Sequence, residues 1–216
     1  MRLAIQLVLW IVIIVLGYLV FNSVYEPIKF NDVKEQRYAK VIENLKDIRD
    51  AELAHKTVTG KFEGNWNNLI RFIDTAQFTL TQRRDTTVMD EEYRKTYGVD
   101  RRKEIVVIDT LGYKSVKDSL FGNSDRYKTM MNIPIAGVDE QIKLDAGMID
   151  KSGTMIPVFE AKVAKETILH DQDRDLVLQE NEVVSVDNVN GPFISVGSMQ
   201  EVNTSGNWPK TYGDAE

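Results

Sequence analysis

One long apolar run at the N-terminus constrains the possible folds of this chain more than any other feature. Residues 3–21 read LAIQLVLWIVIIVLGYLVF, with Gln6 as their only strongly polar side chain. At a helical rise of about 1.5 Å per residue the run spans roughly 28 Å, close to the hydrocarbon core of a bilayer. It is longer than the apolar core of a cleaved signal peptide, and residues 21–24 (FNSV) match a cleavage site poorly. We therefore expect an uncleaved transmembrane anchor over residues 1–24.

The rest of the chain has the composition of a soluble domain with an acidic excess. The whole sequence holds 33 Asp and Glu against 27 Lys and Arg, a formal net charge of −6, with two His and no Cys. A nucleic-acid-binding protein normally shows a basic excess, so we do not expect nucleic acid as a partner. Without cysteine there is no disulfide and no thiolate zinc site, and two histidines leave few ligands for an imidazole site. A hydrophobic share of 43% also excludes a disordered chain.

The charges beside the apolar run do not settle its orientation. Only Arg2 and the terminal amine precede it, whereas Lys29, Lys34, Arg37 and Lys40 follow within twenty residues. Counted literally, the positive-inside rule would place the C-terminal bulk in the cytoplasm. Those four cations belong to a mixed-charge helix rather than to a basic cluster, so the rule leans against an exported domain without deciding the topology.

A second helical pattern follows the anchor, and we expect a stalk helix over residues 25–60. Pro27 lacks an amide hydrogen and its ring opposes a helical carbonyl, so it predicts a kink or a break after the span. Asn31 suits the N-cap of a helix that restarts there. Gly60, in the sequence TVTGKF, predicts the end of this helix.

The apolar residues of the stalk recur at spacings of 3, 4 and 3, which is the rhythm of one helix face. They are Tyr38, Val41, Leu45 and Ile48. We expect them to pack on the head and on any neighbouring subunit, and we expect Gln6 to form a hydrogen bond between helices in the bilayer. These five residues are the predicted interaction site, and they would support a homo-oligomer held by transmembrane and stalk helices.

The passage after the stalk resembles a known family. A short helix is expected over residues 66–73, with Asn65 as its cap. The sequence LKDIRDAELAHKTVTGKFEGNWNNLIRFI (45–73) resembles the stalk-to-head passage of type IV pilins and type II secretion pseudopilins. This resemblance covers about residues 3–74 and implies an α+β head with an antiparallel sheet. The chain begins MRLAIQ, without the glycine and the glutamate that pilins carry there, so processing and polymerisation stay open.

The whole chain also resembles an uncharacterised family of single-pass envelope proteins from the Bacteroidota. That resemblance implies an inner-membrane anchor with a periplasmic head, N-terminus inside and C-terminus outside, and it implies no activity. The segments that carry it are TQRRD (81–85), VIDTLGY (107–113), SDRYKTMMNIP (124–134), PVFEAKV (157–163) and NTSGNWPKTYG (203–213).

We expect the α+β head to occupy residues 61–200. Residues 82–103 mix both charges, which is typical of an exposed excursion, here with a short helix near residues 90–97. The alternative is a docking loop whose arginines meet a partner's carboxylates through their forked hydrogen-bond donors. Those arginines are Arg83, Arg84, Arg101 and Arg102.

Strand patterns follow in the second half of the head. The β-branched residues 105–108 predict a short buried strand. Alternating side chains over residues 141–149 and 154–163, around the turn 150–153, predict an antiparallel hairpin. Pro157 cannot donate to a ladder, so the second of these strands is expected at an edge or a bulge.

The C-terminal quarter predicts a second hairpin and a tail. Residues 183–186 and 193–196 flank a turn sequence rich in Asn and Gly. Residues 201–216 read as a polar C-terminal tail, in which Trp208 and Tyr212 indicate that part of it docks on the head.

No catalytic or cofactor-binding residues are predicted. The chain has no G-x-S-x-G, Walker A or dinucleotide motif, and neither His55 nor His170 belongs to a triad motif. His55 is expected at the end of the stalk helix, partly buried.

One acidic segment has the ligand spacing of an EF-hand loop. Asp171, Asp173 and Asp175 occupy relative positions 1, 3 and 5, and Glu182 occupies position 12. Position 6 is Leu176 rather than the glycine that the sharp turn of such a loop needs. Two hypotheses remain: a candidate Ca²⁺ site formed by these four carboxylates, or an acidic turn between two strands.

The sequence therefore predicts a non-enzymatic, single-pass inner-membrane protein with a periplasmic pilin-like domain. It would be a structural or assembly subunit of an envelope-spanning complex for secretion, motility or a pilus-like machine, with the bilayer and other envelope proteins as partners. The alternatives are a pseudopilin that polymerises into a filament and a calcium-binding periplasmic interaction module.

Overall fold

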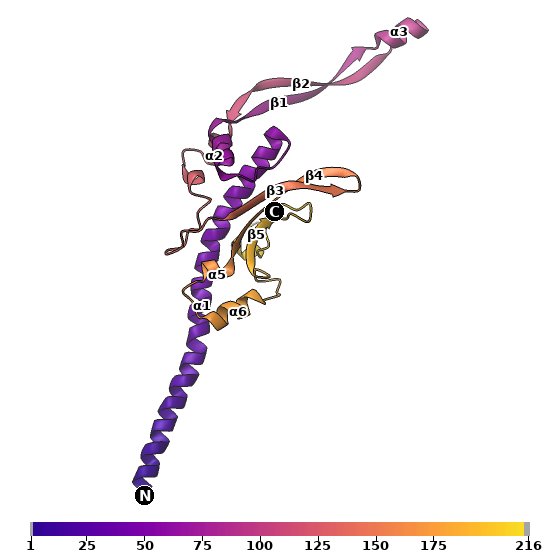
Figure 1. Cartoon of the computed structure of the whole chain (residues 1–216). Coiled ribbons are helices and arrows are strands. Elements are labelled where there is room, and N and C mark those ends of the chain that lie inside the picture. Colours follow the sequence, from indigo (N-terminus) through magenta and orange to yellow (C-terminus); the bar gives the residue numbers. More distant parts are fainter. Residues whose placement is uncertain (1, 214–216) are drawn as a thin grey trace.

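The computed structural model describes residues 2–213 and has an α+β architecture (Figure 1). One long helix, α1 (Arg2–Thr59), carries the rest of the chain on its C-terminal half, and both sheets are antiparallel. The first sheet pairs β1 (Gln77–Met89) with β2 (Arg102–Ser115), and the second has the order β3 (Lys143–Lys151), β4 (Thr154–Ala164), β5 (Phe193–Gly197). The predicted α+β class with a long N-terminal helix is confirmed.

Short helices connect these elements. They are α2 (Trp66–Thr75), α3 (Glu91–Tyr97), α4 (Val116–Leu120), α5 (Lys165–Ile168) and α6 (Arg174–Asn181), with 3₁₀ turns over Arg126–Lys128 and Lys210–Tyr212. The helix predicted after Asn65 is confirmed as α2, because the Asn65 side chain accepts hydrogen bonds from the amides of Asn67 and Asn68 at 3.0 and 3.3 Å.

The anchor and the stalk are one helix. α1 runs for 58 residues through Pro27, so the predicted break at this residue and the helix start at Asn31 are wrong. A proline in a helix interior removes one backbone hydrogen bond and costs about 3 kcal/mol, which long helical flanks on both sides can offset. The predicted end is confirmed: Gly60 has φ +81°, and its amide donates to the Lys56 carbonyl at 2.8 Å.

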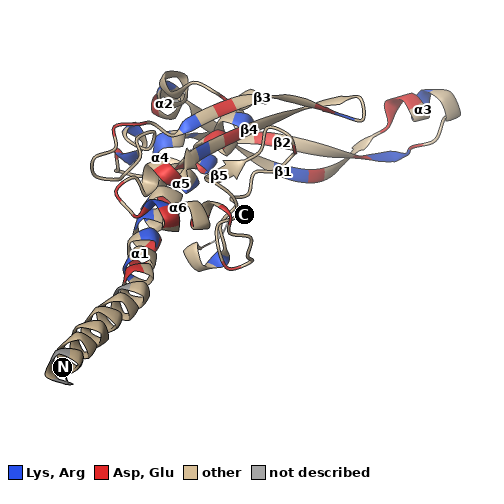
Figure 2. Cartoon of the chain, turned by 60° about the horizontal axis from the view of Figure 1, so that its bottom comes forward, with Lys and Arg blue, Asp and Glu red and all other residues tan. Residues whose placement is uncertain are grey.

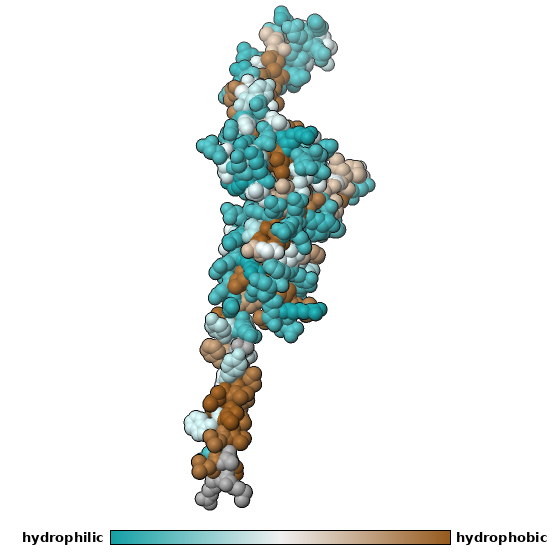
Figure 3. Space-filling model, turned by 60° about the vertical axis from the view of Figure 1, so that its left-hand side comes forward, coloured by the Kyte–Doolittle hydropathy of each residue, from teal (hydrophilic) through white to brown (hydrophobic). Residues whose placement is uncertain are grey.

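The N-terminal part of α1 stands clear of the head. Its large apolar side chains from Leu3 to Phe21 are between 47% and 77% exposed, and they form the brown end of the molecule in Figure 3. Among the residues that the structure describes, α1 is the one helix long and apolar enough to cross a membrane.

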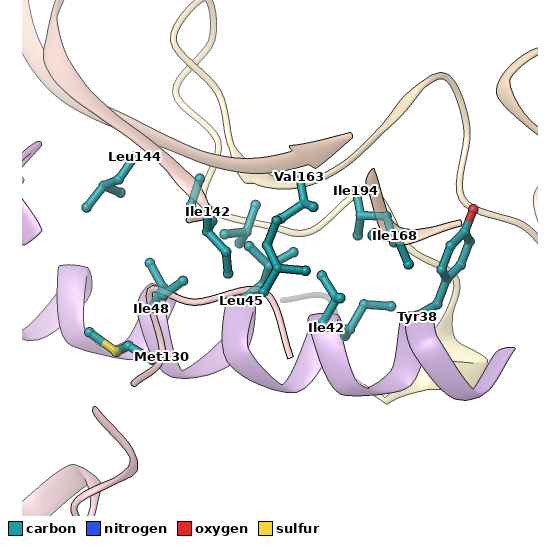
Figure 4. Packing of buried hydrophobic residues seen from close by; sticks show 14 of the residues in the cluster. Tyr38, Ile42, Leu45, Ile48, Met130, Ile142, Leu144, Val163, Ile168 and Ile194 are labelled. Atoms are coloured by element: carbon teal, nitrogen blue, oxygen red, sulfur yellow. The ribbon is translucent and has the colours of Figure 1, made fainter. Parts of the chain in front are cut away.

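The C-terminal half of α1 forms one wall of the core. Tyr38, Val41, Leu45 and Ile48 are at most 1% exposed and belong to the core. Figure 4 shows Tyr38, Leu45 and Ile48 facing the three-stranded sheet and the loops beside it. The head of the same chain covers this face completely, so the four residues present no surface to a neighbouring subunit.

The predicted hairpin of residues 141–163 is confirmed as β3 and β4. Its two-residue turn places Ser152 and Gly153 at φ +56° and +83°, the left-handed pair that a tight hairpin turn needs. β4 is the central strand of its sheet, not an edge strand. Pro157 is tolerated there because β5 pairs only with Glu160–Ala164, which leaves β4 with one neighbouring strand at the proline.

The second predicted hairpin is wrong. Residues 183–186 form a loop, and β5 pairs with β4 instead. Just before this loop, Leu176 and its apolar neighbours lie in α6 rather than in a strand, because the Asp173 side chain caps the helix by accepting from the amides of Asp175 and Leu176 at 3.0 and 3.2 Å.

The C-terminal segment lies on the head. Trp208 is 4% exposed within the core, Tyr212 packs against it, and Gly206 bridges to Val196 of β5. Residues 214–216 of the expected tail fall outside the described part of the chain.

A buried carboxyl group makes the stability of the head depend on pH. Glu52 of α1 is 0% exposed; its Oε2 accepts from the Glu63 amide at 2.9 Å, whereas Oε1 has no partner among the described residues. Burial raises the pKa of the Glu52 carboxyl to about 8, against the opposing effect of that amide. Because the pKa is higher in the folded chain, stability falls as the pH rises from 4.5 towards 8.

We expect Glu52→Gln to flatten this pH dependence. The amide cannot ionise, yet it keeps an acceptor for the Glu63 amide, so the loss of up to about 1.4 kcal/mol per pH unit should disappear. The measurement is the melting temperature of the full chain in detergent between pH 5 and 9, with Glu43→Gln on the exposed face of α1 as the control for charge. Parallel curves for the wild type and Glu52→Gln would contradict the assignment.

Candidate functional site

Two features of the head are candidates for a functional role: a buried polar cluster on α1 and a projecting hairpin. The cluster joins Lys34 and Tyr38 of α1 to Lys165 of α5 and Glu180 of α6. Glu180 Oε2 accepts from Lys34 at 3.0 Å, and Oε1 accepts from Lys165 at 3.1 Å and from the Tyr38 hydroxyl at 3.3 Å. One carboxylate therefore connects three helices.

Lys165 is the most unusual member of the cluster because it is 0% exposed. Its ammonium group donates to the carbonyls of Glu180 and Val189, both at 2.8 Å, in addition to the Glu180 carboxylate. Burial lowers the pKa of Lys165, and the charge of Glu180 opposes this shift. All three donors are matched by acceptors, which is the condition under which a buried ammonium group is tolerated.

A second ion pair lies beside the cluster. The Arg37 guanidinium donates to both carboxylate oxygens of Asp171, at 2.6 and 2.8 Å, and to the Ile168 carbonyl at 2.8 Å. These hydrogen bonds hold the pKa of Asp171 well below its usual range. Together with Lys34, Arg37 fixes the α5–α6 region to α1 a few turns beyond its apolar segment.

The residues of the candidate Ca²⁺ site have other roles in the fold. Asp171 is bound to Arg37, Asp173 caps α6, Asp175 lies in its first turn, and Glu182 follows its last residue. A calcium loop wraps its ligands around the ion, whereas here α6 separates Asp171 and Asp173 at its start from Glu182 at its end. Within residues 2–213, no group of three or more His, Cys, Asp or Glu is placed to hold a metal ion.

The two histidines are held by backbone groups. His55 is 6% exposed at the end of α1; its Nδ1 lies 2.7 Å from the Lys61 carbonyl, and its ring packs edge-on against Phe72. His170 is exposed, with Nδ1 3.3 Å from the Thr167 carbonyl. Gln6 lies exposed in the apolar segment of α1, where the head does not reach it.

The projecting hairpin is the second candidate, and we call β1, α3 and β2 together the arm. Figure 1 shows the arm leaving the head beside α2 and ending in α3, far from the N-terminus. The short helix predicted near residues 90–97 is confirmed. No strand is predicted over β1, and β2 extends well beyond the strand predicted over residues 105–108. Residues 105–108 do form a strand, yet the prediction that it is buried is wrong: Val106 and Ile108 are 48% and 65% exposed.

Three of the four arginines of the predicted docking loop lie on the strands of the arm, and Arg101 lies between α3 and β2. Arg84 forms an ion pair with Asp109 of β2 at 3.0 Å, and Arg101 stacks over the Tyr93 ring with its guanidinium 5.1 Å from the ring centre. Arg83 lies 3.8 Å from Asp85 in a largely exposed pair. Basic and acidic residues both occur along the arm, as the blue and red segments of Figure 2 show.

Comparison of the chain with protein-family models, with curated proteins and with solved structures finds no match.

Truncating Glu180 should destabilise the head far more than truncating Asp171. Glu180→Ala leaves two buried ammonium groups without a carboxylate, a change of about 3–5 kcal/mol for a broken buried pair. Asp171→Ala breaks a pair whose carboxylate is 48% exposed, and we expect a loss of about 1 kcal/mol or less. Urea unfolding of the two detergent-solubilised variants measures the difference; equal losses would show that the cluster does not clamp α5 and α6 to α1.

Proposed function

We propose that the protein is a non-enzymatic, single-pass inner-membrane protein whose head lies in the periplasm and serves as a structural subunit of an envelope assembly. The observation that supports this most is the continuity of α1. The same helix supplies an exposed apolar segment of membrane-spanning length and one wall of the head's core.

A continuous helix has a mechanical consequence. From Phe21 to Thr59 it rises by about 57 Å, so a head fixed to its second half stands at a set height and angle above the membrane. A flexible linker would instead let the head move freely. This rigidity suits a subunit that must present a surface at a fixed position rather than a tethered enzyme that must search for substrate.

The architecture also supports the pilin-like interpretation. A long helix whose second half packs on an antiparallel sheet is the arrangement that the resemblance of residues 3–74 implies. A pseudopilin that polymerises is the alternative, and it requires removal of a leader from the N-terminus. The intact mass of the membrane-extracted chain separates the two, because only the pseudopilin is shorter than the full sequence.

The arm is the surface that we assign to interaction. Within the described residues it pairs only with itself, and its β2 strand exposes Val106, Ile108, Leu111 and Tyr113 to between 48% and 68%. An isolated two-stranded ribbon is marginally stable in water, so a long one with bare apolar side chains is best explained by a partner.

Single-cysteine labelling tests the topology. The chain has no native cysteine, so Lys95→Cys at the tip of the arm and Leu3→Cys at the start of α1 report on opposite sides of the membrane. In intact spheroplasts we expect a membrane-impermeant maleimide to label Lys95→Cys, and to label Leu3→Cys only after the membrane is broken. The reverse pattern would place the head in the cytoplasm.

Removing the outer arm should separate assembly from folding. Joining Thr81 to Thr110, which are paired in the ribbon, by Asn-Gly gives a tight hairpin and deletes residues 82–109. We expect the melting temperature of the head to change by less than about 4 °C, since the deleted strands pair only with each other. Complexes extracted from native membranes should then lose subunits on native gels; unchanged complexes would remove the arm from the proposal.

A further inference from the structure

The arm has two open edges, and they differ in chemistry. β1 and β2 form a sheet of their own, so one edge of each strand has no strand beside it in the part of the chain that the structure describes. The β1 edge carries Gln82-Arg83-Arg84-Asp85, and the β2 edge carries the apolar run Ile105–Ile108. Charged edges resist pairing between like edges, whereas an apolar β-branched edge favours it.

The membrane limits how two arms can meet. If α1 anchors every copy in one membrane, as proposed above, all arms point away from that membrane in the same direction. β1 then runs outward and β2 runs back in each copy (Figure 1). Placing β2 of one copy beside β1 of the next makes an antiparallel pair, which continues the alternation already present in the arm. If two copies instead paired their β2 edges, both β2 strands would run toward the membrane, and the pair would be parallel. An antiparallel pair of β2 edges would require one copy to point its anchor away from the membrane.

Charge selects the register of this contact. Side chains at alternate positions share a face, and Arg84, Thr86 and Val88 lie on the same face as Val107, Asp109 and Ile105. Within one arm, Arg84 is opposite Val107 and reaches Asp109 diagonally. Moving the neighbouring β1 by two residues places three matched pairs across the new contact: Arg84 opposite Asp109, Thr86 opposite Val107, and Val88 opposite Ile105.

The other nearby registers match less well. Without the shift, Arg84 faces Val107, and Val88 faces Lys103. A shift in the opposite direction places Asp85 beside Glu104, two like charges in direct opposition, which destabilises a pair. Only registers that differ by an even number of residues keep the outward-pointing backbone groups of both strands in position to bond.

We propose that the arm binds a second copy of this chain, by adding its β2 edge to the β1 edge of the neighbour in this shifted register. The inference rests on the proposed function, because it uses a common membrane to orient the arms. The contact joins two different edges, so each copy can bind one neighbour on either side, and the product is a ring or an open array rather than a closed pair. Each copy adds two strands and a shift of two residues, or one residue per strand on average. An eight-stranded barrel with a shear of eight has the same average stagger per strand.

Disulfide trapping between two tagged full-length chains tests the contact. One chain carries Thr86→Cys and the other Val107→Cys, in a sequence without other cysteines. Directly opposed residues have Cα atoms about 4.5–5.5 Å apart, within reach of a disulfide. We expect mild oxidation in membranes to link the two chains at least tenfold more than it links either variant to itself. No mixed product, or self-linked Val107→Cys at equal yield, would overturn the proposal.

Charge reversal in the same cysteine chains tests the register. Arg84→Asp alone and Asp109→Arg alone should each lower the yield of the mixed product about tenfold, and the double reversal in every chain should restore it. A double variant as poor as the singles, with an unchanged melting temperature, would exclude this register.

If deletion of the arm disperses the complex while no cysteine pair forms a disulfide, the proposed function is supported and self-association through the arm is refuted. If the cysteine pair forms a disulfide but the head is labelled on the cytoplasmic side, the arm contact is supported and the periplasmic location of the head is refuted.

Discussion

The packing of one face of α1 against the head determines the rest of this structure. The apolar segment and the wall of the core belong to one continuous helix, so the position of the head relative to the apolar segment is set by α1. Tyr38, Val41, Leu45 and Ile48 bury their side chains fully, and burying a large apolar side chain contributes about 1.5–3 kcal/mol. These contacts fix the height of the head along the helix axis and the helix face on which it packs.

The polar cluster adds orientation to this apolar contact. Apolar surfaces tolerate small rotations, whereas Lys34, Lys165 and Tyr38 must all reach the same carboxylate of Glu180. A buried ion pair is weak evidence for net stability, because desolvation offsets much of its Coulomb energy. Its effect on the structure comes from the large cost of leaving one of its buried charges without a partner. A rotated α5–α6 unit would strand two ammonium groups in a low-dielectric environment, so the cluster selects one docking arrangement.

Features with a local cause could be predicted from the sequence, and features with a distant cause could not. The rhythm of the stalk, the Asn65 cap, the Gly60 stop and the β3–β4 turn depend on neighbouring residues, and the structure has all of them. The apolar triplet at Leu176 is too short to distinguish a strand from a helix by periodicity, and the Asp173 cap decides it. The cost of Pro27 taken alone predicts a break, whereas the long helical segments on both sides of it keep α1 continuous. Lys165 and Glu180 meet Lys34 across more than a hundred residues, so nothing near Lys34 in the sequence distinguishes it from the exposed lysines of the same helix.

The β1 strand of the arm has no strand pattern in its sequence, and the reason bears on the role of the arm. Strands in a core alternate apolar and polar residues, but β1 carries Gln82-Arg83-Arg84-Asp85 and resembles a solvated loop. Such a sequence forms a strand only when backbone pairing, rather than side-chain burial, holds it in place. Pairing along one edge is marginal for a two-stranded ribbon, and a second paired edge roughly doubles the hydrogen bonds for each strand in contact. The charges that make β1 resemble a loop in the sequence also distinguish the registers at its edge, since an opposite charge directly across from Arg84 stabilises a pair and a like charge destabilises it.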